Sequence, residues 1–207
     1  PEGVRLVAIS KYHPADAIAE AYNAGQRDFG ENKAQDLVAK QQALPTDIRW
    51  HFTGHLQSNK IKYIAPFVYM IHSIDSIQLL REIDKHGAKN NRTIPCLLQI
   101  HIAQEETKFG FTPEECLAML ATKEWKELKN IHIRGLMCMA SNTDDLQQVA
   151  AEFKAVRALF GEIRDRWFAE DSEFDTLSAG MSGDYLTAIE AGSTCVRIGS
   201  SIFEDEI

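Results

Sequence analysis

Residues 95–100 read PCLLQI, and residues 112–115, a short connection later, read TPEE. The first run is apolar nearly throughout, which is typical of a strand covered on both faces in a parallel sheet. In the second run Thr112 is placed as an N-cap, Pro113 as the first helical residue and Glu115 as the third, which together predict a helix start. The two runs therefore predict one strand and helix of an α/β protein.

The same alternation extends in both directions along the chain. Short β-rich runs lie before and after this unit, and segments with helical spacing connect them. The eight predicted strands are residues 6–9, 28–30, 49–53, 69–72, 95–100, 131–139, 174–177 and 194–198. Eight strands with helical connections match a (β/α)8 TIM barrel better than an open, doubly wound sheet. We therefore expect residues 1–207 to form one α/β domain of the TIM-barrel class.

Several helix boundaries carry signals of their own. Asp75 is predicted to cap one helix, and Gly87 to end it. Ser182 is placed to cap the last helix, which is predicted to end at Gly192. Nine residues follow Ile198, too few for a full helix, so we expect the outer ring to lack one helix and to need an N-terminal helix that is missing from this sequence.

Charge and composition exclude several classes of partner. The chain has 22 Lys and Arg against 30 Asp and Glu, a formal net charge of -8, which repels nucleic acid and anionic membranes. No stretch approaches the roughly 18 apolar residues of a membrane-spanning helix, and the start lacks the features of a signal peptide. The four cysteines lie far apart and form no metal-binding or disulfide pattern. We expect a cytoplasmic monomer that binds no nucleic acid, membrane or metal.

A TIM barrel places its site at the carboxyl ends of the strands, often with a phosphate on the last two loops. Those loops read LSAGMSGD over residues 177–184 and RIGSS over residues 197–201. Their backbone N–H groups and serine hydroxyls suit a phosphate dianion. Glycine and serine are also ordinary turn residues, so the position in the barrel carries this interpretation.

Two basic residues stand out at the same end. Arg197 lies between Val196 and Ile198 in a strand that a barrel buries, so it needs either a carboxylate on a neighbouring strand or a ligand. Lys11 ends the first strand at the barrel mouth, although most lysines are solvated surface charges. A partly desolvated amine beside a cation is a nucleophile that condenses with an aldehyde. Together with a phosphate cradle, these groups suit pyridoxal 5′-phosphate (PLP) held as an imine.

The sequence resembles the YggS/PROSC family, the pyridoxal phosphate homeostasis proteins, from about Leu6 to Phe203. The family has the barrel of the alanine racemase N-terminal domain, the type III PLP-binding fold. Six ordered segments carry the resemblance: VAISK at 7–11, GQRDFGEN at 25–32, WHFTGHLQSNK at 50–60, RGLMCM at 134–139, LSAGMSGD at 177–184 and VRIGS at 196–200.

The resemblance implies a role for each of seven cofactor-binding residues. Lys11 would form the covalent imine with PLP, and Arg197 would face the pyridine nitrogen. Asn32 would lie near the ring, with Met181 as a further contact. The phosphate would be held by Ser182, Gly199 and Ser200. His55 lies in the most family-like segment and has no assigned role beyond a place near the mouth, where it could equally orient a loop.

Three functions remain open. The first is a PLP carrier, without established catalysis, that stores, buffers or delivers the cofactor inside the cell, with PLP-dependent apoenzymes or amino acids as possible partners. The second is an amino-acid racemase of the alanine racemase type, and the third is a cofactor-free barrel enzyme that acts on a phosphorylated metabolite. An arginine at the pyridine nitrogen weakens the ring as an electron sink, which favours the carrier.

Overall fold

The computed structural model describes residues 3–105 and 109–203. Within these ranges, eight parallel strands close into one barrel in which neighbours in sequence pair and β8 returns to β1. The strands are β1 (Arg5–Ile9), β2 (Asp28–Glu31), β3 (Arg49–Phe52), β4 (Met70–Ile74), β5 (Ile94–Ile100), β6 (Ile131–Cys138), β7 (Thr176–Ala179) and β8 (Cys195–Ile198). The predicted TIM-barrel class is confirmed.

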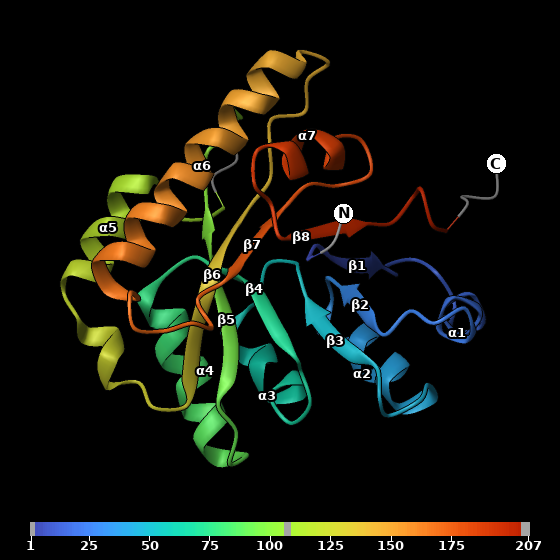
Figure 1. Ribbon diagram of the computed structural model, residues 1–207. Helices are drawn as coiled ribbons and strands as arrows, with labels where there is room; N and C mark the ends of the chain where they lie inside the picture. Colours follow the sequence, from blue (N-terminus) through green and yellow to red (C-terminus); the bar gives the residue numbers. More distant parts are fainter. Residues whose placement is uncertain (1–2, 106–108, 204–207) are drawn as a thin grey trace.

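Helices connect the strands on the outside of the barrel (Figure 1). They are α1 (Ala15–Asn23), α2 (Ala34–Ala43), α3 (Ile61–Ile64), α4 (Ile77–Lys89), α5 (Pro113–Ala121), α6 (Leu146–Trp167) and α7 (Tyr185–Glu190), with 3-10 turns η1 (Ser58–Lys60) and η2 (Glu124–Glu127). Their apolar faces are buried against the strands, as Ile83 of α4 and Phe153 of α6 illustrate. Residues 199–203, the last described, contain no helix, and the rest of the segment after β8 lies outside the described residues.

The helix boundaries agree with the sequence at one predicted cap and differ at another. Thr112 and Glu115 form a capping box, with hydrogen bonds of 3.1 and 3.0 Å between each side chain and the other residue's N–H. The predicted cap Asp75 is wrong, because Ser76 is the residue that accepts a hydrogen bond from the Leu79 N–H, at 3.1 Å. The carboxylate of Asp75 lies instead 3.7 Å from His55.

Two further boundaries differ from the prediction. Gly87 does not end α4, which continues to Lys89. A Cβ atom at Gly87 would stand 2.7 Å from the Asn130 carbonyl oxygen, so this glycine permits a close approach of backbones. β7 begins at Thr176, later than predicted, and Phe174 before it stacks its ring on Phe168, with centroids 4.3 Å apart.

The interior of the barrel differs from the layer between strands and helices. That outer layer holds the main apolar cluster, which contains Cys96, Leu98 and Ile100 of β5. The opposite face of β5 contributes Leu97 to a small inner cluster with Met70 and Met137. The remaining buried interior side chains include polar ones from several strands, which is unusual because branched apolar residues normally fill TIM barrels.

No helix in the described parts of the chain has both the length and the apolar character needed to cross a membrane.

Candidate functional site

A cavity of about 240 Å³ opens at the carboxyl ends of the strands. Four of the seven predicted cofactor residues line it: Lys11, Asn32, Met181 and Arg197. The remaining lining comes from residues that the sequence did not single out for ligand contact: Ile9, Thr53, Gly54, His55, Gln99, Phe109 and Met139. Because β1, β2, β7 and β8 all end here, residues far apart in sequence meet at one site.

Arg197 reaches the floor of this cavity from inside the barrel. Its side chain is buried and donates hydrogen bonds to Ser178 Oγ at 2.6 Å and to the Cys138 carbonyl oxygen at 3.0 Å. Among the described residues no carboxylate lies within 4 Å of the guanidinium, so of the two alternatives for Arg197 the structural ion pair is not found there. Burial lowers the pKa of Arg197, because neutral acceptors replace only part of its hydration.

Lys11 follows β1 by two residues, and β1 pairs directly with β8, the strand that carries Arg197. Lys11 is exposed, and its Nζ lies 5.8 Å from the centre of the Tyr12 ring. Tyr12 has a φ of 68°, so the backbone turns sharply just after the lysine. In the described residues Lys11 also has no carboxylate within 4 Å, which leaves its amine available to a ligand.

Asn32 is held in place by a close contact between two loops. It follows β2, and its backbone and Cβ lie against Gly54 in the loop after β3. A Cβ atom at Gly54 would stand 2.6 Å from the carbonyl oxygen of Asn32. Glycine is therefore required at position 54 for Asn32 to line the cavity.

The last two loops meet beside the cavity through Ser182. Its Oγ accepts hydrogen bonds from the N–H groups of Gly199 at 3.3 Å and Ser201 at 3.4 Å. The prediction that Ser182 caps α7 is wrong, because α7 follows Asp184. The Ser182 hydroxyl instead links the two loops. Two N–H groups that converge on one oxygen can equally serve a phosphate oxygen, so this arrangement fits the predicted cradle.

The other two predicted phosphate residues lie at the same place. Gly199 approaches β1 closely, since a Cβ atom there would stand 3.1 Å from the Ile9 carbonyl oxygen. Ser200 is exposed beside it. Ser182, Gly199 and Ser200 thus form one group next to the cavity, although they do not line it.

A buried charged cluster below Lys11 was missed by the sequence reasoning. The carboxylate of Glu31 is fully buried, accepts from the Ser10 hydroxyl, and pairs with Lys40 Nζ at 2.9 Å. Lys40 Nζ also donates to the Ser10 carbonyl oxygen at 2.8 Å. This cluster fixes the backbone that carries Lys11. Glu31 lies in a family-like segment, but no sequence signal connects it with Lys40 in the next helix.

His55 lies at the rim of the cavity. Its ring is 5.1 Å from Phe109, centre to centre, and its Nδ1 is 3.7 Å from Asp75. These contacts come from two different loops, which agrees with either interpretation of His55, a contact at the mouth or a loop-orienting residue.

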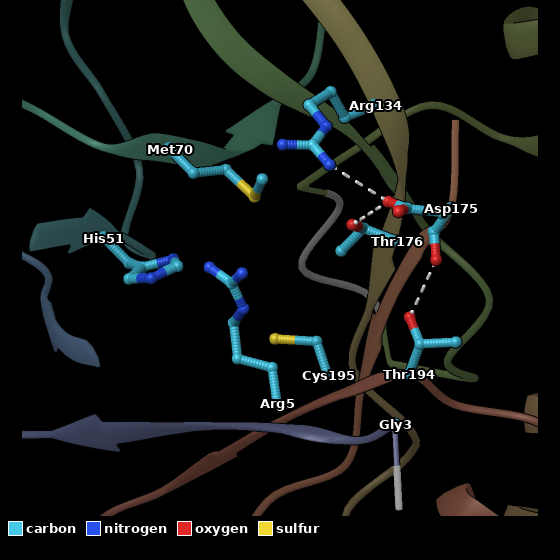
Figure 2. A pocket seen from close by; sticks show the side chains of 9 residues that line it. All are labelled: Gly3, Arg5, His51, Met70, Arg134, Asp175, Thr176, Thr194 and Cys195. Carbon is cyan, nitrogen blue, oxygen red and sulfur yellow. Dashed lines mark hydrogen bonds and ion pairs between the residues drawn. The ribbon is translucent and has the colours of Figure 1, made fainter. Parts of the chain in front are cut away.

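A second cavity, of about 140 Å³, lies at the amino ends of the strands (Figure 2). Its cations are already paired: Arg134 with Asp175 at 3.2 Å and Arg5 with Asp28 at 3.3 Å. Figure 2 also shows Thr176 and Thr194 bonded to Asp175, through its carboxylate and its carbonyl oxygen respectively. Paired charges at the end of a TIM barrel that seldom holds active sites indicate a structural role.

The fold and the first cavity together define a class: a parallel α/β barrel with a lysine amine, a buried guanidinium and converging loop N–H groups at its mouth. The family described as "Alanine racemase, N-terminal domain" matches residues 1–206. This chain belongs to that family and, within it, to the YggS/PROSC group of pyridoxal phosphate homeostasis proteins, which confirms the resemblance.

Two curated relatives illustrate the group. The pyridoxal phosphate homeostasis protein of Vibrio alginolyticus is 39% identical over 210 residues, which cover 98% of this chain and 87% of that protein. The protein of the same name from Schizosaccharomyces pombe is 38% identical over 203 residues, covering 97% of this chain and 83% of that protein.

Solved structures give the same assignment. PipY of Synechococcus elongatus with PLP bound has a TM-score of 0.87 at 36% identity, covering 98% of this chain and 93% of PipY. The structure of PipY without PLP has a TM-score of 0.91, covering 98% and 94%. An alanine racemase of Clostridium difficile has a TM-score of 0.76 at 14% identity over 100% of this chain and 53% of the racemase, a likeness of fold alone.

Proposed function

We propose that this protein binds PLP at the barrel mouth as an imine with Lys11, and that it stores, buffers or delivers the cofactor. One observation carries the proposal: an amine and a buried guanidinium face the same cavity, and neither has a carboxylate partner among the described residues. Both cations are therefore free to bind an anionic, carbonyl-bearing ligand. The names of the relatives and the PLP-bound PipY support this choice of ligand.

Each residue of the site has a part in this proposal. The Lys11 amine attacks the aldehyde carbon, a C=N bond forms, and one water leaves. Ser182, Gly199 and Ser200 bind the phosphate through hydroxyl and N–H groups. Asn32 and Met181, which both line the cavity, contact the ring, and Arg197 donates to the pyridine nitrogen.

The same residues favour a carrier over an enzyme. An arginine keeps its proton at any ordinary pH, so a pyridine nitrogen that faces Arg197 stays unprotonated and stabilises a carbanion poorly. A racemase also needs an acid and a base on opposite faces of the substrate carbon. No tyrosine or cysteine lines the described part of the cavity. The four cysteines are buried elsewhere, and burial raises the pKa of each thiol, to about 11 for Cys195.

The test is the absorption spectrum of the purified protein with PLP, before and after borohydride reduction, followed by mass spectrometry of peptides. We expect a visible imine band and a reduced pyridoxyl group on Lys11. Lys11→Ala should abolish both. Lys33→Ala is a matched control, because Lys33 is also exposed and its Nζ lies 5.9 Å from the same Tyr12 ring.

Two outcomes would contradict the proposal. The proposed role of Lys11 would be wrong if the reduced pyridoxyl group were found on another residue, or if no pyridoxyl group were found at saturating PLP. Interconversion of alanine or serine isomers at roughly 1 per second or faster would favour the racemase. The solution mass of the loaded protein tests the proposed monomer at the same time.

A further inference from the structure

A chain of buried polar side chains crosses the interior of the barrel from Arg197 to Asp28. Ser178 Oγ accepts from Arg197 at 2.6 Å and lies 2.9 Å from His72 Nδ1. His72 Nε2 lies 2.8 Å from His51 Nδ1, and His51 Nε2 lies 2.9 Å from the Asp28 carboxylate. The five residues come from β8, β7, β4, β3 and β2, so tertiary structure alone brings them together.

The two ends of the chain determine which atom donates in each bond. Asp28 is a carboxylate that accepts from Arg49 at 2.8 and 2.9 Å, so His51 Nε2 must carry a hydrogen toward it. Burial lowers the pKa of both histidines, which makes the neutral rings the relevant form. His51 Nδ1 is then an acceptor, and His72 donates to it through Nε2.

The same logic continues to Arg197. His72 Nδ1 is left as an acceptor, so the Ser178 hydroxyl hydrogen points toward His72. The lone pairs of Ser178 Oγ therefore remain for the Arg197 guanidinium. Every donor in the chain points away from Arg197 and toward the negative charge of Asp28, which compensates a buried cation that has no carboxylate partner in the described residues.

We propose that Ser178, His72 and His51 are positioning residues that hold the Arg197 guanidinium against the ligand by linking it to the Asp28 carboxylate through a one-way series of hydrogen-bond donors. The inference rests on the proposed function in so far as the ligand is PLP. His51 also lines the amino-terminal cavity beside Arg5 (Figure 2), whereas Arg197 lines the cavity at the mouth, so the chain connects the two ends of the barrel.

A neighbouring serine shows that burial alone does not produce such a chain. Ser73, next to His72 on β4, is buried, and its Oγ has no hydrogen-bond partner within the residues described. Ser178 is equally buried and is bonded on both sides. Serine-to-alanine substitutions at Ser178 and Ser73 therefore compare a residue inside the hydrogen-bonded chain with one outside it.

The first test uses the ligand-free protein with its natural sequence. Nitrogen-15 spectra of the histidine rings should show His51 and His72 as neutral rings with hydrogen on Nε2. At pH 7, hydrogen on Nδ1 of either neutral ring would reverse its donation, and a charged ring would donate from both nitrogens. Either result would overturn the proposal.

The second test compares Ser178→Ala with Ser73→Ala. We expect Ser178→Ala to shift the nitrogen-15 signal of Arg197 Nε in the ligand-free protein and to weaken PLP binding about tenfold, because a charge-assisted hydrogen bond is lost. Ser73→Ala should leave the Arg197 Nε signal unshifted and change the PLP affinity by less than about twofold, because Ser73 lies outside the hydrogen-bonded chain. Equal behaviour of the two variants would overturn the proposal.

The third test separates positioning from packing at His72. His72→Asn keeps an oxygen acceptor near the place of Nδ1, whereas His72→Leu removes it while filling space. The asparagine variant should keep most of the Arg197 signal and of the PLP affinity, and the leucine variant should lose both. Equal losses in the two variants would contradict the proposed role of the chain.

The proposed function and the proposed chain can fail separately. Failure of the natural sequence to bind PLP would refute the proposed function, whereas the nitrogen-15 spectra of the histidine rings test the chain without PLP.

Discussion

The two ends of the barrel carry charge in opposite ways. At the amino ends Asp28 is bonded to Arg5, Arg49 and His51. Figure 2 shows the second ion pair at this end, between Arg134 and Asp175. At the carboxyl ends Lys11 and Arg197 have no carboxylate within 4 Å among the described residues. The mouth is also the more apolar of the two, with Phe109 and Met139 in its lining.

The difference separates charges that stabilise the fold from charges reserved for a ligand. A buried charge is costly unless it is paired, and the amino-terminal end meets this requirement within the protein. At the mouth, the direct hydrogen-bond acceptors of Arg197 are neutral, and the Asp28 carboxylate is linked to it only through Ser178, His72 and His51. Residues of this kind bind ligands at some cost to stability. Substitutions at the amino ends should therefore change the free energy of unfolding, and substitutions at the mouth should change the affinity for PLP.

The largest effect is expected at Asp28. Burial raises the pKa of this carboxyl, but hydrogen bonds from His51 and Arg49 outweigh burial and hold the pKa well below its usual 3.8. Asp28→Asn should lower the free energy of unfolding by about 2 kcal/mol, because it removes the anion that the buried His51 and the partly exposed Arg5 and Arg49 share. Denaturant unfolding measures the change. The exposed Asp144→Asn is the control, and a loss below about 0.5 kcal/mol at Asp28 would show that this end is not the stabilising one.

At the mouth, Arg197→Met should change binding and leave stability nearly unaltered. We expect PLP affinity to fall at least about tenfold, since a charged hydrogen bond to the ring is lost. The free energy of unfolding should change by less than about 1 kcal/mol, because removal of the desolvation cost offsets the hydrogen bonds lost by Ser178 and Cys138. Titration with PLP and urea unfolding measure the two quantities. If Arg197→Met greatly lowered the free energy of unfolding and left the PLP affinity unchanged, the charges at both ends of the barrel would serve stability.

The pH dependence of stability sharpens the comparison between the ends. Burial holds the pKa of His72 well below its usual 6.5, with further lowering by His51, Arg197 and Arg5. The unfolded chain therefore binds a proton that the folded protein refuses, so stability present above pH 6.5 is lost as the pH falls. Between pH 7 and pH 6 we expect about 0.7 kcal/mol from this residue.

Urea unfolding of His72→Asn at both pH values should show a smaller decrease than the natural sequence. Ser73→Ala, a neighbour that does not titrate, should show the natural decrease. An unchanged pH dependence in His72→Asn would mean that the histidine is already charged in the folded protein.

The smallest effect is expected at Gly199. Alanine there would bring a Cβ atom to 3.1 Å from the Ile9 carbonyl oxygen, so the loop must move by a few tenths of an ångström. PLP affinity should fall about twofold, as hydrogen bonds to the phosphate lengthen. Gly183→Ala is the matched control, because nothing lies within 4 Å of its added Cβ atom. Equal affinities in the two variants would remove Gly199 from the phosphate site.

The sequence by itself determined the barrel and the end at which its site lies. Alternating strand and helix signals are local, and parallel strands joined by helices place all their carboxyl ends together. The prediction that Lys11, Asn32, Met181 and Arg197 share one place follows from this topology and from the family segments, and all four line one cavity in the structure. Their roles toward PLP stay predictions.

Only the tertiary structure decided how the buried charges are compensated. The links from Arg197 through Ser178, His72 and His51 to Asp28 join five strands, and the hydroxyl of Ser182 bonds to another loop instead of its own helix. Hydrogen-bond partners depend on ångström-scale distances between segments that may be 106 residues apart, as for His72 and Ser178. No local pattern of residues encodes such distances, because they result from the closure and register of the whole barrel.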